Sequence, residues 1–515
     1  MLPIIYLALS VACLPQVRES KQNNPDFDGL VSDLKKELPG WGVAGFTLGV
    51  IDLNNNQKQT WTAALGLKNA SNPDDPVNVD TLFHIGSDSK LFTAFTVGHL
   101  VDQGKLDLKT PFKTYWPTFK LKDPFSENRA NLIDMLSHRM GLSRVLDLLM
   151  FKYNKTSEMR TRLANLEPSE EFRTSFKYNN HMFAYAGDLV GKLTDPSTTN
   201  PTQSWIKAVR DVVFKPVGLN SALASFDEFI NSPNIALVHG NAEMVLPRET
   251  NRWTDVVAPA GAISMNIVDR LKWIEFLMNK GTTQDGKSIL KPETFQLLFS
   301  PHNLYPSQNP APVAGANLAS FISTYRGETV IKHGGTVSGG ISVTCFFPDR
   351  KFGVVSLYTG QDFGKDNFCY DVADRLLFKD SKTLKNTFDF MKQRKETFLT
   401  HLKTVQDSFD GRKKDTKPSF VIEQSFGEYV NPVLGSGFLE IASFPNSVFQ
   451  LDLQISRIPI LPFVHFENNK FVTPVDDGTD NSVEVHVERG VIKGFTLRLE
   501  GTTDDLKDGL YFEKV

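Results

Sequence analysis

A serine and a lysine three positions apart form the strongest candidate for catalysis in this sequence, in the segment Ser87-Asp88-Ser89-Lys90. Positions i and i+3 of a helix share one face, so the hydroxyl and the amine would meet, and burial would lower the pKa of Lys90 toward that of a base. The same S-x-x-K spacing recurs at Ser32, on a charged amphipathic stretch that is typical of a solvated helix face. Only Ser87 has a glycine directly before it and an apolar helix after it, so we predict that Ser87 is a nucleophile.

A tyrosine and an asparagine form a second candidate pair in Tyr178-Asn179-Asn180, ahead of a predicted helix. Beside a lysine ammonium the phenolate of Tyr178 would be favoured, and this side chain could serve as a general acid or base. The carboxamide of Asn180 could bind a substrate carbonyl or hold Lys90. Tyr429 begins the same Y-x-N pattern, but it lies at the entry to a β-rich segment, where a tyrosine at a strand edge accounts for it.

A third candidate is His333-Gly334-Gly335, which leads into a predicted strand that begins at Thr336. Paired glycines allow a strand backbone to approach a substrate closely, with its N–H groups pointing into a site. His84 starts a competing H-x-G match, but no strand follows it. We therefore expect the strand that begins at Thr336 to be an edge strand beside the site, with the histidine and the glycines leading into it.

Taken in order, the three elements resemble the motif set of the serine β-lactamase-related superfamily, which includes class C β-lactamases, D-alanyl-D-alanine carboxypeptidases, D-aminopeptidases and esterases. That superfamily carries S-x-x-K, then Y-x-N or S-x-N, then K-T-G or H-x-G. The resemblance covers about residues 40–375 and includes the stretches LVDQGKLDLKTP, MLSHRMGL and APAGAISMNIVDRLKWIEFL. The β-rich segment beginning FGEYVNPVLG is similar to the lipocalin-like barrel of some secreted members.

The resemblance implies a role for each matching residue. Ser87 would be acylated, while Lys90 and Tyr178 would share the proton transfers that activate it and protonate the leaving group. Asn180 would orient the acyl amide or the lysine. The backbone N–H groups of Ser87 and Thr336 would form the oxyanion hole.

His333 stands where β-lactamases carry a lysine. Imidazole titrates near 6.5 and is only partly cationic at neutral pH, so a permanent cation for a β-lactam carboxylate is missing at this position. The histidine form is more similar to the peptidases and esterases, which puts antibiotic hydrolysis in doubt. Three other histidines lie in apolar segments with helical spacing and are interpreted as packed core residues: His99, His138 and His181.

We therefore predict a serine hydrolase that forms an acyl-enzyme on Ser87 and acts on a small ester, amide or short peptide, with no metal and no cofactor. An acyltransferase is one alternative, because a dry site would redirect the same intermediate from water to an amine or alcohol. A non-catalytic binding protein on this fold is a second alternative. The sequence has no G-x-S-x-G, H-E-x-x-H or P-loop motif, which disfavours α/β-hydrolases, zincins and P-loop enzymes.

The elements expected around these residues form an α+β fold, with a β-lactamase/transpeptidase-like sheet, flanking helices and a helical subdomain. Residues 41–66 predict a hairpin, and the residues after Ser87 predict a buried helix that Gly104 closes. The middle of the chain is helix-rich, and residues 331–360 return to strands. We therefore expect one sheet that a late return of the chain completes.

Length and composition predict a globular protein of two domains. The 515 residues carry a net charge of −3, which leaves no excess of cations for nucleic-acid binding. We expect a leader at 1–20, a hydrolase domain at 24–378, a basic helical linker at 379–420 and a small antiparallel lipocalin-like β-barrel at 421–515.

An apolar run from Leu2 to Cys13 has the length of a secretory signal core, so we expect a secreted protein with no membrane span. A buried N-terminal strand or helix is the alternative, because no Lys or Arg precedes the run. Asn69 and Asn154 are glycosylation acceptors. Beyond the leader only Cys345 and Cys369 remain, and the sequence leaves open whether they pair. A homo-oligomer also stays open.

Overall fold

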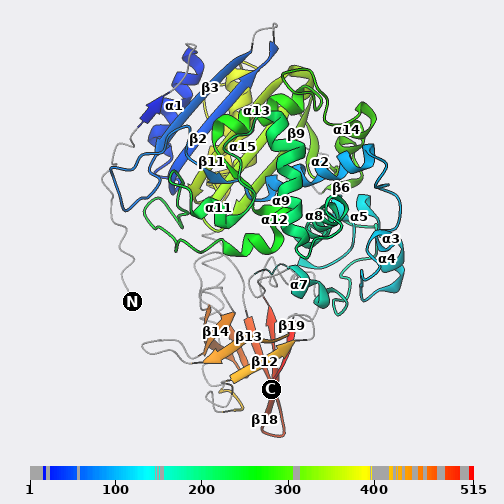
Figure 1. Ribbon diagram of the computed structural model, residues 1–515. Helices are drawn as coiled ribbons and strands as arrows, with labels where there is room; N and C mark the ends of the chain where they lie inside the picture. The colour runs from blue at the N-terminus through cyan, green and yellow to red at the C-terminus, as the bar shows by residue number, and fades with distance from the viewer. Residues whose placement is uncertain are drawn as a thin grey trace.

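The computed structural model describes residues 16–18, 24–54, 58–144, 147, 150, 156–305, 314–394, 396, 417–420, 425, 427–431, 435–442, 451–455, 461–472, 482–498 and 510–514. These residues form a large domain of helices and strands and a smaller β domain, which Figure 1 shows in orange and red. Among the described residues, no helix combines the length and the apolar character that crossing a bilayer requires.

The large domain is built on one antiparallel sheet with the strand order β1-β3-β2-β11-β10-β9-β8-β7-β6. Its strands are β1 (Gln16–Arg18), β2 (Val43–Asp52), β3 (Gln59–Gly66), β6 (Asn303–Tyr305), β7 (Ala314–Ala316), β8 (Phe321–Tyr325), β9 (Glu328–Val337), β10 (Gly340–Phe347) and β11 (Phe352–Gly360). A short ladder pairs β4 (Phe83–His84) with β5 (Ser264–Met265).

Most of the helices lie between the two strand regions, as the helix-rich middle of the sequence predicts. They are α1 (Pro25–Glu37), α2 (Ser89–Asp102), α3 (Phe112–Tyr115), α4 (Pro124–Arg129), α5 (Leu132–Leu136), α7 (Thr156–Leu163), α8 (Asn180–Thr194), α9 (Pro201–Val209), α10 (Lys215–Val217), α11 (Phe226–Ile230), α12 (Ala258–Gly261), α13 (Ile267–Met278), α14 (Pro292–Phe299) and α15 (Lys365–Leu376). The 3₁₀ segments η2 (Gly86–Asp88), η5 (Arg252–Val257) and η6 (Pro348–Arg350) and the π-helical segment η4 (Arg210–Phe214) complete the helical elements.

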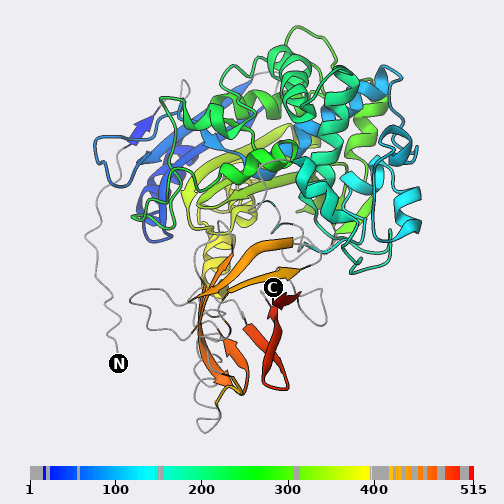
Figure 2. The same cartoon turned by 60° about the horizontal axis from the view of Figure 1, so that its bottom comes forward.

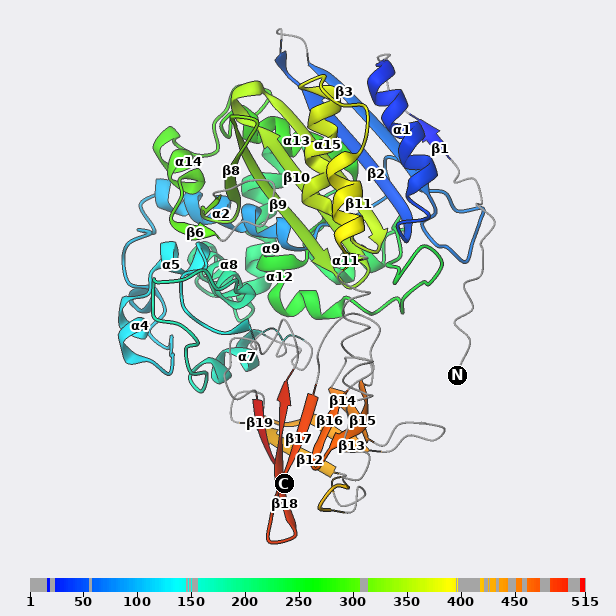
Figure 3. The ribbon, with the colours of Figure 1, turned by 180° about the vertical axis from the view of Figure 1, so that it is seen from behind.

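Helices cover both faces of the sheet. Helices α1 and α15 pack on one face, and Figure 3 shows them in front of the strands. Helix α13 packs against β2 and β11 on the other face, and α2 lies against α8, α12 and α14. Because both faces are covered, β10 and β11 are buried along their whole length instead of alternating between core and solvent.

The predicted hairpin and the predicted late return of the chain are both confirmed. Strands β2 and β3 pair in an antiparallel hairpin, and β11 pairs with β2 in a register that places Phe352 opposite Asp52. The question of the two cysteines is also resolved, because Cys345 in β10 and Cys369 in α15 form a disulfide. That bond ties α15 to the centre of the sheet.

The small domain is antiparallel, as the turn spacing predicts. It consists of β12 (Gly427–Asn431), β13 (Gly435–Ala442), β14 (Leu451–Ile455), β15 (Leu461–Glu467), β16 (Lys470–Val472), β17 (Ser482–Glu488), β18 (Val491–Arg498) and β19 (Leu510–Lys514). Each strand pairs with the next, and β12 also pairs with β19. Figure 2 shows this β domain as a body beside the large domain.

Two predicted segments are described only in part. Within the predicted leader, residues 16–18 form β1, which pairs with β3 at the edge of the sheet, and the other leader residues lie outside the described ones. Within the predicted linker, residues 385–394 are helical, and residues 397–416 lie outside the described ones. The domain boundaries therefore stay predictions.

Candidate active site

Ser87 lies in the single turn η2, which runs directly into α2, as the glycine and the apolar helix around it predict. Gly86 has a φ of +51°, a left-handed conformation that favours glycine. The hydroxyl of Ser89 donates to the carbonyl of Gly86 over 2.7 Å and accepts the N–H of Ile263 over 3.0 Å. The turn that carries the nucleophile is therefore held from both sides.

Lys90 is fully buried and touches the predicted nucleophile. Its Nζ lies 3.0 Å from Ser87 Oγ, 2.7 Å from Asn180 Oδ1 and 2.9 Å from the carbonyl oxygen of Ala260. A neutral amine has two hydrogens and one lone pair. If the amide and carbonyl oxygens receive the hydrogens, the lone pair faces the hydroxyl of Ser87 and can accept its proton.

The electrostatic surroundings favour that neutral amine. Burial lowers the pKa of Lys90 from 10.5 to about 7, while Asp147 and Asp88 act to raise it and Arg144 acts to lower it. Half of the lysine is therefore neutral near pH 7, where an exposed lysine would be almost entirely charged.

Tyr178 and Asn180 are both neighbours of the Lys90 amine. The Lys90 Nζ is 4.8 Å from the centre of the Tyr178 ring, and the Asn180 amide nitrogen donates to Asp147 Oδ1 over 3.1 Å. Burial raises the pKa of Tyr178 above its ordinary value, and a hydrogen bond with Ser87 opposes the rise in part. The expectation of a favoured phenolate is therefore wrong at rest, because desolvation by burial favours the neutral phenol.

His138 is a site residue that the sequence interpretation missed. It is buried, its Nδ1 accepts the N–H of Asn179 over 3.1 Å, and its ring centre lies 4.3 Å from that of Tyr178. Burial holds the pKa of His138 well below 6.5. A single histidine among apolar residues belongs to no spaced motif, so the sequence does not distinguish a site contact from core packing. Of the other two predicted core histidines, His181 is buried and His99 is half-exposed.

The expectation of an edge strand that begins at Thr336 is wrong, because Thr336 lies near the end of β9, a strand that pairs with β8 on one side and β10 on the other. The backbone of β9 lies directly against the nucleophile turn. A Cβ on Gly335 would lie 1.8 Å from the carbonyl oxygen of Ile85, and a Cβ on Gly86 would lie 2.9 Å from the Thr336 nitrogen. Only glycines permit this approach. The amides of Ser87 and Thr336 therefore belong to neighbouring segments, which is the arrangement that the predicted oxyanion hole requires.

His333 is 5% exposed, and its ring lies 5.3 Å from that of Phe321. Its Nδ1 lies 2.7 Å from the carbonyl oxygen of Gly334, and burial lowers its pKa to about 4. The imidazole is thus neutral at pH 7, not partly cationic as its ordinary pKa predicts. The amine of Lys365 in α15 lies nearby instead, where it donates to the hydroxyl of Thr336 over 2.7 Å.

The competing motif matches lie elsewhere, in settings that explain them without chemistry. Ser32 is exposed on α1. His84 is buried among aromatic rings. Tyr429 lies in the core of the β domain, where its hydroxyl donates to the carbonyl of Ser425 over 2.6 Å, and not at a strand edge as interpreted.

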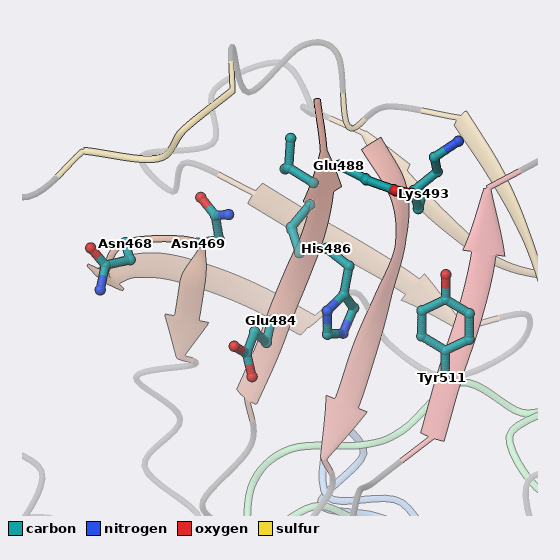
Figure 4. A pocket seen from close by; sticks show the side chains of 9 residues that line it. Asn468, Asn469, Glu484, His486, Glu488, Lys493 and Tyr511 are labelled. Carbon is teal, nitrogen blue, oxygen red and sulfur yellow. The ribbon is translucent and has the colours of Figure 1, made fainter. Parts of the chain in front are cut away.

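Two surface pockets lie away from the residues that the motifs bring together. One, of about 560 Å³, lies on the β domain and is lined by the turn before β16 and by residues of β17, β18 and β19; there His486 lies 2.7 Å from the Thr496 hydroxyl (Figure 4). The other, of about 630 Å³, includes Phe125 and Phe172 near α4. Of the predicted glycosylation acceptors, Asn69 is half-exposed, and Asn154 lies outside the described residues.

Solved structures share this fold at low sequence identity. An octameric penicillin-binding protein homologue from Pyrococcus abyssi matches with a TM-score of 0.58 and 16% identity, over 95% of this chain and 100% of that one. A D-amino acid amidase from Ochrobactrum anthropi SV3 matches with a TM-score of 0.52 and 16% identity, over 72% of this chain and 100% of that one. At this identity the likeness establishes the fold alone.

Curated relatives match the same region of the sequence. The unguisins hydrolase ungD' of Aspergillus campestris (strain IBT 28561) is 27% identical over 339 residues, which are 63% of this chain and 60% of that protein. The chain thus spans about 60% of the length of the first curated relatives it matches. The family model described as beta-lactamase matches residues 40–376, a segment that includes every predicted catalytic residue. This chain therefore belongs to the beta-lactamase family.

Proposed function

We propose that the protein is a serine hydrolase that forms an acyl-enzyme on Ser87 and releases the acyl group to water. The observation that carries the proposal is the buried amine of Lys90, which lies 3.0 Å from the Ser87 hydroxyl and has a pKa of about 7. The names of its relatives support the same class of reaction, because they include an unguisins hydrolase and a D-amino acid amidase. Substrates would be small esters, amides or short peptides.

In acylation, neutral Lys90 takes the proton of Ser87 as Oγ attacks the substrate carbonyl. The oxyanion that forms would lie between the N–H groups of Ser87 and Thr336. When the tetrahedral intermediate collapses, Tyr178 protonates the leaving amine or alcohol, and the Lys90 ammonium returns a proton to the resulting phenolate. In deacylation, Lys90 takes a proton from the water that attacks the ester on Ser87, and the Lys90 ammonium then protonates Ser87 Oγ as the carboxylic acid leaves.

An active-site phosphonate tests the nucleophile. We expect the wild type to form a stoichiometric adduct on Ser87 and Ser87→Ala to form none. An equal adduct in Ser87→Ala would move the nucleophile elsewhere, and an unlabelled wild type would favour the non-catalytic binding protein. Product analysis with and without added amines or alcohols separates hydrolysis from the alternative of acyl transfer, because a transferase diverts product to the acceptor.

Secretion is part of the proposal. The apolar run in the predicted leader and the disulfide between Cys345 and Cys369 support it, because such bonds persist in oxidising compartments. Expression of the tagged full chain in secreting cells, followed by N-terminal sequencing of the secreted product, tests it. An intact N-terminus on protein retained in the cytosol would refute secretion.

We further propose that the β domain is a lipocalin-like barrel and that the protein assembles with copies of itself. The pairing of β12 with both β13 and β19 supports the barrel. The printed description of the Pyrococcus abyssi homologue as octameric supports the assembly. Light scattering of the full chain at several concentrations tests the oligomer, and a constant monomer mass would refute it.

A further inference from the structure

The residue after the nucleophile, Asp88, is a buried carboxylate held by three donors. It is 4% exposed, and its Oδ2 accepts from Arg270 over 2.7 Å, from the Ser342 hydroxyl over 2.7 Å and from the Thr344 hydroxyl over 3.1 Å. Arg270 lies on α13 and is fully buried. A buried carboxylate is costly unless it is paired and hydrogen-bonded, so these contacts hold Asp88 in place.

Ser342 connects this carboxylate to the strand that carries the predicted oxyanion amide. Its hydroxyl accepts the N–H of Gly335 over 2.9 Å, and it lies 2.8 Å from the carbonyl oxygen of Ile85 as well as 2.7 Å from Asp88. One hydroxyl on β10 thus contacts β9 and both sides of the nucleophile turn. The close approach of Gly335 to Ile85 leaves no space for a side chain between the two segments.

We propose that Asp88, Arg270 and Ser342 form a positioning unit that sets the separation of the amides of Ser87 and Thr336. Asp88 fixes the turn through its own backbone, while Ser342 fixes β9 through Gly335. The unit acts through these segments and does not touch the substrate. This inference rests on the proposed acyl-enzyme chemistry, because the spacing of the two amides matters only when an oxyanion forms between them.

The contacts themselves distinguish this unit from an ion pair that only stabilises the fold. A buried ion pair is weak support for stability by itself, because desolvation offsets much of the attraction. Here the carboxylate is adjacent in sequence to Ser87, and its second oxygen, Oδ1, lies 3.8 Å from His333 Nδ1. Every group that Asp88 contacts on the sheet lies on β9 or β10, next to the predicted oxyanion hole.

Ser342→Ala removes the central hydroxyl, and the neighbouring strand offers a matched control. Ser356 of β11 is also fully buried, but its hydroxyl has no hydrogen-bond partner among the described residues. Ser356→Ala therefore removes the same group from the same sheet without a contact to the nucleophile turn. Asp88→Asn keeps the shape of the side chain but removes the charge, and it provides a second, independent perturbation.

The test measures the second-order rate of phosphonate labelling at Ser87 in the full chain, together with kcat and KM for an ester and the thermal midpoint. We expect Ser342→Ala and Asp88→Asn to lower the labelling rate and kcat by about 10- to 100-fold with little change in KM, since a displaced oxyanion donor acts on the transition state. Ser356→Ala should match the wild type. Ser342→Thr, which restores a hydroxyl, should recover most of the rate.

Each outcome has a separate meaning. Wild-type labelling rates in a folded Ser342→Ala variant would overturn the positioning unit while leaving the acyl-enzyme proposal intact. If kcat falls only in proportion to the thermal midpoint, and Ser356→Ala shows the same fall, the three residues stabilise the fold and do not position the amides. A wild type that never labels at Ser87 would overturn the proposed function itself.

Discussion

The pKa of Lys90 can be tested through the pH dependence of kcat/KM, with two variants that should move it in opposite directions. The neutral amine is the proposed base, so activity should fall as pH drops and Lys90 gains a proton. Asp147 acts to raise the pKa of Lys90, and Arg144 acts to lower it. Asp147→Asn should therefore move the acidic limb to lower pH, and Arg144→Gln should move it to higher pH.

The magnitude follows from the surroundings of Lys90. Burial brings its pKa from 10.5 to about 7. That change corresponds to roughly 5 kcal/mol in favour of the neutral form, and it raises the neutral fraction at pH 7 from about one in 3,000 to one half. Below pH 7 the value of kcat/KM should fall about tenfold per pH unit. Because Asp147 and Arg144 are partly exposed, each variant should shift the midpoint by roughly half a pH unit.

The assay measures initial rates with a neutral ester between pH 5 and pH 9, at constant ionic strength. His333 should not contribute to the limb near pH 7, because burial lowers its pKa to about 4. Burial raises the pKa of Tyr178 above its ordinary value, so its titration lies on the alkaline side. A flat profile between pH 5.5 and pH 7.5, or shifts of both variants in the same direction, would refute the assignment of Lys90 as base.

Three further predictions concern the proton donor, the cation beside β9 and the disulfide. Tyr178→Phe should lower kcat at least about a hundredfold with an amide substrate, as measured by steady-state kinetics, because it removes the proton donor. Lys365→Met should raise KM for carboxylate-bearing substrates and leave neutral esters unchanged, because its ammonium contacts Thr336. Replacing both Cys345 and Cys369 with alanine should lower the free energy of unfolding by about 3 kcal/mol in urea titrations.

Each of these predictions has a direct counter-result. Near-full amide turnover by Tyr178→Phe would require another proton donor. If Lys365→Met raises KM equally for neutral and anionic substrates, the substitution damages the site in general, and Lys365 does not recognise the substrate charge. If a reductant leaves the urea midpoint of the wild type unchanged, while the double alanine variant is destabilised, the loss reflects packing and not the disulfide.

The sequence predicted those parts of the site that depend on local spacing. Ser87 and Lys90 share a helix turn, so their contact follows from the period of the helix. The glycine before Ser87 and the pair before Thr336 also carry a local signal, because only glycine permits the backbone contact that the structure contains. The single sheet that a late return of the chain completes followed from the β-rich segments at both ends of a helical middle, although the order of its strands was not predicted.

The parts that could not be predicted depend on contacts between distant segments. Asp88 occupies a variable position of its motif, and its partner Arg270 lies 182 residues away on another helix, so no spacing relates them. The tilted contact between the rings of His138 and Tyr178 and the shifted pKa values arise from burial, which one sequence does not report residue by residue. The same limit applies to the pairing of Cys345 with Cys369.

The position of β11 also has a consequence for synthesis of the chain. Strand β11 lies between β2 and β10, so the N-terminal hairpin has no partner on one side until residue 360 has been made. Contacts over such separations form slowly, and unpaired apolar strands invite association with other chains. A nascent or truncated chain that ends before β11 would expose an open edge of β2, and it would depend on chaperones in a way that the finished protein does not.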